Sequence, residues 1–149
     1  MPQSYTNFVY HFIFSTKRRR PWLTRQMRPR LFAYIGGICK RSDAVLLGAG
    51  GHDDHVHLLV RLHPETSPAE AMEKIKANST SWLKTTYPAL NGFAWQKGYT
   101  GFSVSRSVVP AVRGYLAKQE EHHKRVSFLD ELDVFLAKHG MKRRKDDDD

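Results

Sequence analysis

The N-terminal part of the chain begins with a run of aromatic and β-branched residues that alternate as in a β-strand. This run, residues 7–15, reads NFVYHFIFS, a composition typical of strands. A second alternating run, residues 55–62, reads HVHLLVRL and places valine and leucine on one face, with His55 and His57 on the other. The alternation predicts that this strand buries its apolar face and exposes its histidines.

Apolar residues at three-to-four spacing predict four helices along the chain. Each begins at a residue that favours a helix N-terminus. The predicted helices cover residues 24–40 with Thr24 as the cap, residues 67–85 with Ser67 or Pro68 as the start, a segment capped by Ser107, and residues 127–140.

Two further segments predict the remaining strands. Residues 44–51 are rich in glycine and predict a short strand and a turn, and residues 92–105 predict strand, turn and strand. The order β-α-β-β-α-β, followed by two helices, predicts an α+β sandwich of the ferredoxin-like, RRM-like type. In such a fold the helices cover one face of an antiparallel sheet. Here we expect two C-terminal helices in addition to this basic fold.

Length and composition limit the class of protein. A chain of 149 residues suits one domain, which we place at residues 1–141, and residues 142–149 (KRRKDDDD) are predicted to form a disordered charged tail. No apolar stretch approaches the length of a membrane helix, and no signal-peptide pattern is present. The single cysteine, Cys39, excludes an internal disulfide and predicts a small buried side chain. We therefore expect a soluble, cytoplasmic protein.

The positive charge of the chain is concentrated near its N-terminus. The formal net charge is +9, and residues 1–42 contain nine basic side chains and no acidic one. The remaining residues are neutral in sum. Such an asymmetry indicates a polyanionic partner.

Two groups of residues could support catalysis. His55 and His57 project from one face of a strand, about 6–7 Å apart, so that both imidazoles can reach one divalent ion. Two ligands do not make a metal site, so from the spacing alone the alternative is a strand with two surface histidines that have no function. Tyr115 and Gln119 are four residues apart and share a helix face, although a tyrosine on an apolar stripe is usually a core residue. Gly114 inside that helix costs about 1 kcal/mol relative to alanine, which indicates a need for packing or mobility.

Several segments, taken in order, resemble one known family. They read YHFIFSTKRRRPWL, GGHDDHVHLLV, FAWQKGYTGFSVS and VRGYLAKQEEHHKRVSF, with a closing KHG. In this order they resemble the single-tyrosine HUH transposases of the insertion-sequence 200/605 type, over a span from about Tyr10 to Gly140. The His-x-His pair followed by a Tyr-x-x-x-Gln motif is the specific part of the resemblance.

The resemblance implies a role for each of four residues. His55 and His57 match the histidine pair that binds a catalytic Mg²⁺ or Mn²⁺, and Gln119 matches the third protein ligand. Tyr115 matches the nucleophile, which attacks single-stranded DNA and forms a 5′-phosphotyrosine when an insertion sequence is mobilised. The resemblance also implies a homodimer with composite active sites and a DNA substrate with hairpin ends.

The basic N-terminal region gains a role from the same resemblance. Its clustered side chains would contact DNA phosphates and fix the position of the strand without reading its sequence. The residues expected to do so are Lys17, Arg18, Arg19 and Arg20. A protein that acts in this way would associate with the nucleoid when bound to DNA.

Three other functions remain open from the sequence. The segment HVHLL begins like the loop of a histidine-triad hydrolase, but that chemistry needs a third histidine where the chain has Leu59. A ferredoxin-like sheet with a basic edge also describes a non-catalytic nucleic-acid-binding module. A domesticated relative that processes repeats without mobilising an element is the third alternative.

Overall fold

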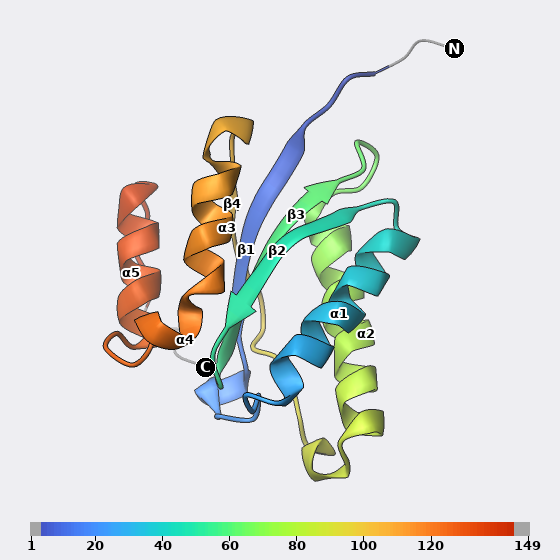
Figure 1. Ribbon diagram of the computed structural model, residues 1–149, viewed down its shortest axis with the longest axis vertical. Coiled ribbons are helices and arrows are strands. Elements are labelled where there is room, and N and C mark those ends of the chain that lie inside the picture. Colours follow the sequence, from blue (N-terminus) through green and yellow to red (C-terminus); the bar gives the residue numbers. More distant parts are fainter. Residues whose placement is uncertain (1–3, 145–149) are drawn as a thin grey trace.

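Four antiparallel strands form the sheet at the centre of the computed structural model, which describes residues 4–144 (Figure 1). The strands are β1 (Phe8–Ser15), β2 (Val45–Gly51), β3 (His55–Leu62) and β4 (Thr100–Ser103), and they lie in the order β2-β3-β1-β4. β1 and β3, the two strands with the clearest alternation, occupy the centre of the sheet. The alternating runs are therefore the parts of the sheet that have neighbours on both sides.

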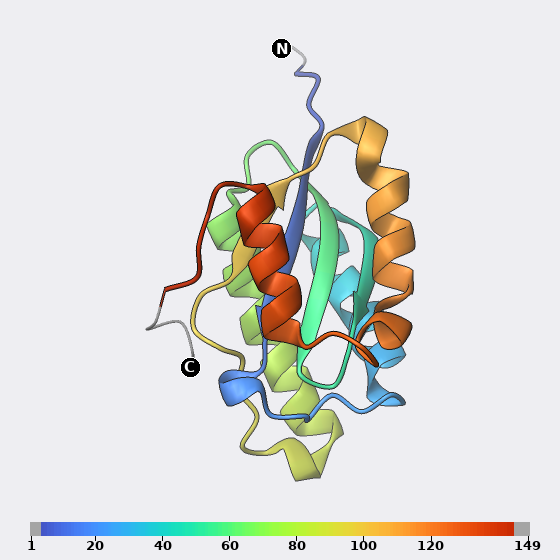
Figure 2. The ribbon, with the colours of Figure 1, turned by 90° about the vertical axis from the view of Figure 1, so that its left-hand side faces the viewer.

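Helices cover both faces of this sheet (Figures 1 and 2). α1 (Met27–Arg41) and α2 (Pro68–Thr86) pack against one face. α3 (Val109–Ala117), the short α4 (Gln119–His122) and α5 (Phe128–Lys138) cover the other. The order β-α-β-β-α-β, followed by the added C-terminal helices, confirms the predicted α+β architecture.

The larger core lies between the sheet and the α1–α2 layer. It contains the apolar face predicted for β3, of which Val56, Leu58 and Val60 are fully buried, together with Phe12 and Phe14 of β1. Cys39 also belongs to this core, as predicted. Burying side chains of this size removes apolar surface from water, and this burial is the main force that holds the two layers together.

The second face of β3 is buried as well, which corrects one prediction. His55 and His57 are completely buried, whereas the alternation predicted that they would be exposed. Two smaller apolar clusters cover this face: α3 packs over Leu59, and α5 packs over Ile13 of β1. A sheet with helices on both faces leaves no solvated side, so polar residues on β3 lie inside the protein.

The glycines of β2 allow α3 to approach the sheet closely. A Cβ atom on Gly50 would collide with the backbone carbonyl oxygen of Leu116 and would lie 3.2 Å from Cγ of Gln119. A Cβ atom on Gly48 would lie 3.3 Å from Cγ of Arg113. The glycine-rich segment therefore makes room for the helix that precedes Gln119.

The structure confirms two of the predicted helix caps and corrects two. Ser67 and Ser127 accept hydrogen bonds from the backbone of the residue three positions later. α1 begins at Met27, and Thr24 accepts through its backbone carbonyl rather than acting as a side-chain cap. Ser107 lies within a 3₁₀ turn, Arg106–Val108, and caps nothing.

One further segment, residues 92–105, differs from the prediction, and most of the predicted C-terminal tail lies outside the residues that the structure describes. Residues 92–105 form one strand, β4, and an isolated bridge between Thr16 and Trp95, because the strand predicted before the turn pairs at a single residue. Residues 145–149 lie outside the described residues, so the disordered tail and its boundary after residue 141 stay predictions. Within residues 4–144, no helix has the length and apolar character needed to span a bilayer.

Candidate active site and metal centre

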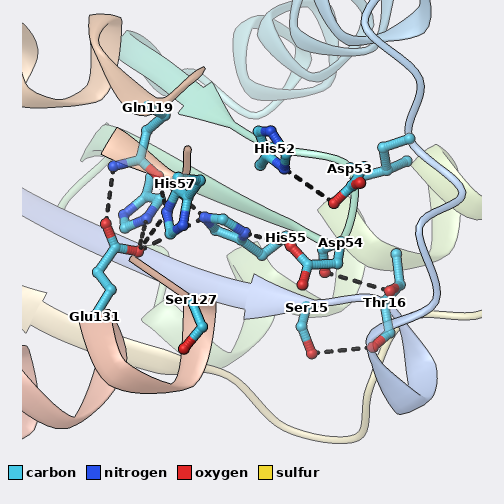
Figure 3. A network of polar contacts seen from close by, with 12 residues as sticks. Ser15, Thr16, His52, Asp53, Asp54, His55, His57, Gln119, Ser127 and Glu131 are labelled. Atoms are coloured by element: carbon cyan, nitrogen blue, oxygen red, sulfur yellow. Dashed lines mark hydrogen bonds and ion pairs between the residues drawn. The ribbon is translucent and has the colours of Figure 1, made fainter. Parts of the chain in front are cut away.

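Five polar side chains from four parts of the chain meet between the second face of the sheet and α5. Figure 3 labels four of them, His55, His57, Gln119 and Glu131. We call all five the donor cluster. It consists of His55 and His57 on β3, Gln119 at the start of α4, His123 just after α4, and Glu131 on α5.

The cluster is dry. His55 and His57 are fully buried, and Gln119 and Glu131 are 1% and 3% exposed. Polar groups are buried in this way only when they are hydrogen-bonded or bind an ion.

The donor atoms of the cluster point at a common centre. Nε2 of His57 lies 2.8 Å from Oε1 of Glu131, and Nε2 of His123 lies 3.2 Å from the same oxygen. Nε2 of His55 lies 3.0 Å from Oε1 of Gln119 and 3.6 Å from Oε1 of Glu131. Three imidazole nitrogens and two oxygens therefore converge from different elements.

The outer nitrogens of the same three rings each contact a fixed partner. Nδ1 of His55 lies 2.8 Å from a carboxylate oxygen of Asp54, and Nδ1 of His123 lies 2.6 Å from the Val126 carbonyl oxygen. Nδ1 of His57 lies 2.8 Å from Nε2 of His11 on β1. A bond on one ring nitrogen fixes the ring orientation and leaves the other nitrogen for the centre, as metal-binding histidines require.

The donor set fits a divalent metal ion. One ligand atom from each of His55, His57, His123 and Glu131 lies within 4.8 Å of the other three. Two ligand atoms that each lie about 2.0–2.3 Å from one ion can be separated by at most about twice that distance. The spacing of these four atoms therefore suits a single ion. A second group, His52, Asp53 and Asp54, also meets this distance criterion, but it lies nearer the surface and Asp54 already contacts His55.

Tyr115, on α3, reaches the same cluster. Its hydroxyl donates a hydrogen bond to Oε2 of Glu131, and Nε2 of Gln119 donates to that oxygen at 2.9 Å. The helix that was expected to carry both residues is interrupted at Lys118, between α3 and α4. A Cβ atom on Gly114 would have nothing within 4 Å, so packing does not require this glycine.

Burial and hydrogen bonds within the site shift the pKa values of its ionisable side chains. Burial lowers the pKa of His57 to about 4 and that of His11 to about 3. Burial alone would raise the pKa of Glu131, but hydrogen bonds from His123 and His57 hold it well below its usual range. Burial, followed by the contact with Glu131, raises the pKa of Tyr115. The resting site thus contains a carboxylate and a protonated tyrosine.

A cleft of about 460 Å³ gives access to Tyr115 and Glu131 from the side of α3 and α5. Phe135 and Val134 of α5 line it, and His122 lies in its wall. The His122 Nε2 atom is buried and lies 3.2 Å from Oε2 of Glu131 without forming a hydrogen bond. The nucleophile candidate is therefore reachable from outside, whereas the histidines of β3 are not.

The basic residues predicted to contact DNA lie outside this cluster. Lys17–Arg19 form a 3₁₀ turn directly after β1, and Arg20 stacks over Trp22 at 5.4 Å. The turn lines a surface cavity of about 230 Å³. It follows Ser15, which pairs with His55 in the sheet, so the turn and the donor cluster lie at the same end of the sheet.

The structure therefore brings together all four residues to which the sequence assigned chemistry, and it adds others. The sequence motif assigns no role to His123, although it lies one helical turn after Gln119 on the same side. Nothing in the sequence distinguishes Glu131 beyond its place in the first turn of the helix that Ser127 caps. Nothing local in the sequence indicates His11, which only the strand register of β1 against β3 could reveal. From the sequence, Asp54 is either an outer ligand or a turn residue, and in the structure its carboxylate contacts Nδ1 of His55.

Comparison with known proteins identifies the family. The family model described as "Transposase IS200 like" matches residues 4–119. The chain belongs to the IS200-like transposase family. This confirms the resemblance seen in the sequence, and it makes the protein a DNA-binding recombination enzyme, one that cleaves DNA and transfers strands, in a family that is in general metal-dependent.

Individual relatives agree with this assignment. The transposase of insertion sequence element IS200 from Salmonella typhimurium is 25% identical over 123 residues, which cover 79% of this chain and 80% of the relative. The ISDra2 transposase TnpA of Deinococcus radiodurans is 23% identical over 117 residues, which cover 75% and 84%.

Solved structures show the same fold. A crystal structure of a Deinococcus radiodurans protein assigned as a transposase has a TM-score of 0.65 at 22% identity, covering 80% of this transposase and 96% of that chain. A REP-associated tyrosine transposase bound to a REP hairpin has a TM-score of 0.62 at 15% identity, covering 85% and 74%. Glu131 and all of α5 lie beyond the segment that the family model matches.

Proposed function

We propose that this transposase cleaves single-stranded DNA through Tyr115 and forms a 5′-phosphotyrosine intermediate as it mobilises an insertion sequence. The metal ligands in this proposal are His55, His57 and Gln119, which would hold Mg²⁺ or Mn²⁺. The observation that carries the proposal is that the Tyr115 hydroxyl and the two β3 histidines contact one and the same carboxylate, Glu131.

The reaction exchanges one phosphoester bond for another. The Tyr115 oxygen forms a bond to the phosphorus while the bond from phosphorus to the 3′ oxygen of the DNA breaks. The phenol proton passes along its hydrogen bond to Glu131 and from there to solvent water, and the leaving oxygen takes up a proton from the solvent and becomes a 3′-hydroxyl, so the number of protons is conserved. The covalent link conserves the phosphoester, so the 3′-hydroxyl of another strand can reverse the step.

Each side chain has a separate task in this step. Gln119 donates to the carboxylate that holds Tyr115 and offers its oxygen to the centre of the cluster. His11 and Asp54 keep the Nε2 atoms of His57 and His55 directed inward. What a divalent ion supplies at such a centre is polarisation of the scissile phosphate and stabilisation of the leaving oxygen.

The DNA partner in this proposal is a single strand with hairpin ends. Its support is the exposed basic turn at residues 17–20, beside the donor-cluster end of the sheet, and a neighbour of similar fold that is described as bound to a REP hairpin. Phosphate contacts by lysine and arginine would hold the strand near the cleft that leads to Tyr115. A homodimer with composite sites belongs to the same proposal, because one tyrosine per site requires a second site for strand exchange.

A covalent-trapping assay tests the proposal. The protein is incubated with Mg²⁺ or Mn²⁺ and labelled single strands from both ends of its encoding locus, and the products are separated on a denaturing gel. We expect a retarded protein–DNA band on one strand, absent from Tyr115→Phe and in the presence of a chelator. Tyr99→Phe is the matched control and should keep the band, because Tyr99 lies just before the edge strand β4 and packs against Phe12 on the other face of the sheet.

Two outcomes would contradict the proposal. Cleavage without a covalent band would make the site hydrolytic and Tyr115 structural. Binding of the strands without cleavage, with Tyr115→Phe and His57→Ala binding as the unchanged protein does, would favour a non-catalytic nucleic-acid-binding module.

A further inference from the structure

Glu131 is the acidic side chain at the centre of the donor cluster, and the function proposed above gives a task only to its Oε2, which accepts from the Tyr115 hydroxyl. It is 3% exposed, and it lies on α5, beyond the family-matched residues 4–119. A carboxylate is removed from water at a large cost unless it is paired or binds a metal. Its surroundings therefore indicate what it binds.

We propose that Glu131 and His123 are further ligands of the divalent ion, and that Glu131 also positions the nucleophile. In this arrangement Oε1 of Glu131 joins the donor set while Oε2 holds the Tyr115 hydroxyl. The inference rests on the proposed function, because it takes the ion at His55 and His57 as its starting point.

The two oxygens of Glu131 face different groups. Oε1 lies 2.8 Å from Nε2 of His57, 3.2 Å from that of His123 and 3.6 Å from that of His55. Oε2 accepts from the Tyr115 hydroxyl and from Nε2 of Gln119. One side of the carboxylate is thus surrounded by ring nitrogens, and the other side by hydrogen-bond donors that include the nucleophile.

His123 is oriented like the two strand histidines, with Nε2 directed at the centre of the cluster and Nδ1 held by a fixed partner. Its Nε2 contacts both Oε1 of Glu131 and, at 2.9 Å, Oε1 of Gln119, and its Nδ1 is held by the Val126 carbonyl oxygen. It packs against the ring of His55, with the ring centroids 4.3 Å apart. Its orientation is therefore that of a ligand held from behind, which an incidental surface histidine would not need.

This donor set favours particular metal ions. Three imidazoles with one carboxylate and one amide oxygen suit manganese and the later first-row metals better than magnesium, which prefers oxygen ligands and water. We expect Mn²⁺ to bind at least tenfold more tightly than Mg²⁺.

A direct metal titration of the full-length protein tests the inference without any DNA. Free Mn²⁺ is followed by its electron paramagnetic resonance signal in the unchanged protein, in Glu131→Gln and in Asp130→Asn. Glutamine keeps the shape of Glu131, and Asp130 is a neighbouring exposed acid on the same helix, so both variants remove one charge. We expect the Mn²⁺ dissociation constant to rise more than tenfold in Glu131→Gln and to change less than twofold in Asp130→Asn.

A second measurement on the unchanged protein keeps the inference testable if Glu131→Gln does not fold. Pulsed electron paramagnetic resonance of bound Mn²⁺ counts the coordinated imidazoles, and labelling with ¹³C-glutamate adds a ¹³C coupling where a glutamate carboxylate is bound. We expect three imidazole nitrogens and one such coupling. Tyr115→Phe should keep both signals, because the phenol contacts only the other oxygen.

The outcomes separate this inference from the proposed function. Two imidazoles, no ¹³C coupling and an unchanged dissociation constant in Glu131→Gln would overturn the inference and leave the His55–His57 ion in place. A complete lack of Mn²⁺ binding by the unchanged protein would overturn both.

Discussion

Two neighbouring acids, Asp53 and Asp54, show how a single residue acts on the donor cluster. Both contribute backbone carbonyls that tie the turn before β3 to the segment after β1. Their side chains differ: Asp54 contacts Nδ1 of the buried His55, and Asp53 contacts Nδ1 of the partly exposed His52 (Figure 3). Burial would raise the pKa of Asp54, but the bond with His55 holds it below its usual value, so this side chain stays an acceptor for the ring.

We therefore predict that Asp54→Ala weakens Mn²⁺ binding by about 10–100-fold, the usual effect of removing the partner of a metal-binding histidine. The backbone bonds of the turn do not depend on the side chain, so the fold should be preserved. Asp53→Ala is the matched control and should change the affinity less than twofold. Equal effects of the two substitutions in the same titration would mean that the turn, and not the ring orientation, controls the site.

At the scale of elements, the contact between β2 and α3 decides where Tyr115 and Gln119 lie. The glycine-rich sequence of β2 indicated a turn, but in the structure Gly50 lies within the strand, where the backbone of α3 leaves no room for a Cβ atom. An added methyl group would push α3 away from the sheet, and α3 carries Tyr115, the proposed nucleophile, near its C-terminal end.

Gly50→Ala should therefore lower the stability by about 1–3 kcal/mol, the typical cost of overpacking, and should reduce the covalent adduct at least tenfold. Gly37→Ala on α1 is the control, because a Cβ atom there would have nothing within 4 Å and alanine favours a helix by up to about 1 kcal/mol. Thermal unfolding and the trapping gel measure both effects. An adduct of normal yield from Gly50→Ala would show that the position of α3 is not set by this contact.

At the scale of the whole molecule, the strands and most helices could be predicted from the sequence. The layer of helices on the second face of the sheet, formed by α3, α4 and α5, could not. The alternation of β3 identified its apolar face correctly, because that face packs against α1 and α2. The burial of His55 and His57 could not be predicted, since it depends on α5 folding back over the sheet, where Phe128 and Phe135 pack against their rings. Tyr115 and Gln119 are four residues apart, so a local motif could identify them. Glu131 lies on α5 and joins them only when α5 packs on the sheet, so no local motif could identify it.

The position of the basic turn relative to the donor cluster leads to a prediction for DNA binding. Lys17 and Arg18 are exposed at the end of β1 beside the cluster, whereas Lys40 and Arg41 lie at the far end of α1 (Figure 1). Each phosphate contact to a single strand contributes about 0.7 to the slope of log affinity against log salt concentration.

The double variant Lys17→Gln/Arg18→Gln should therefore lower that slope by about 1.4 and weaken binding most at low salt. Arg18 has a positive φ of 56°, and glutamine meets the same backbone strain there as arginine, so stability should change little. Lys40→Gln/Arg41→Gln removes the same charges from the other end of the molecule and should leave the slope unchanged. Because Mn²⁺ affinity depends on the donor cluster and not on the turn, it should be the same in both variants. Equal slopes in the two variants would mean that net charge alone attracts the DNA and that the turn has no specific place in the complex.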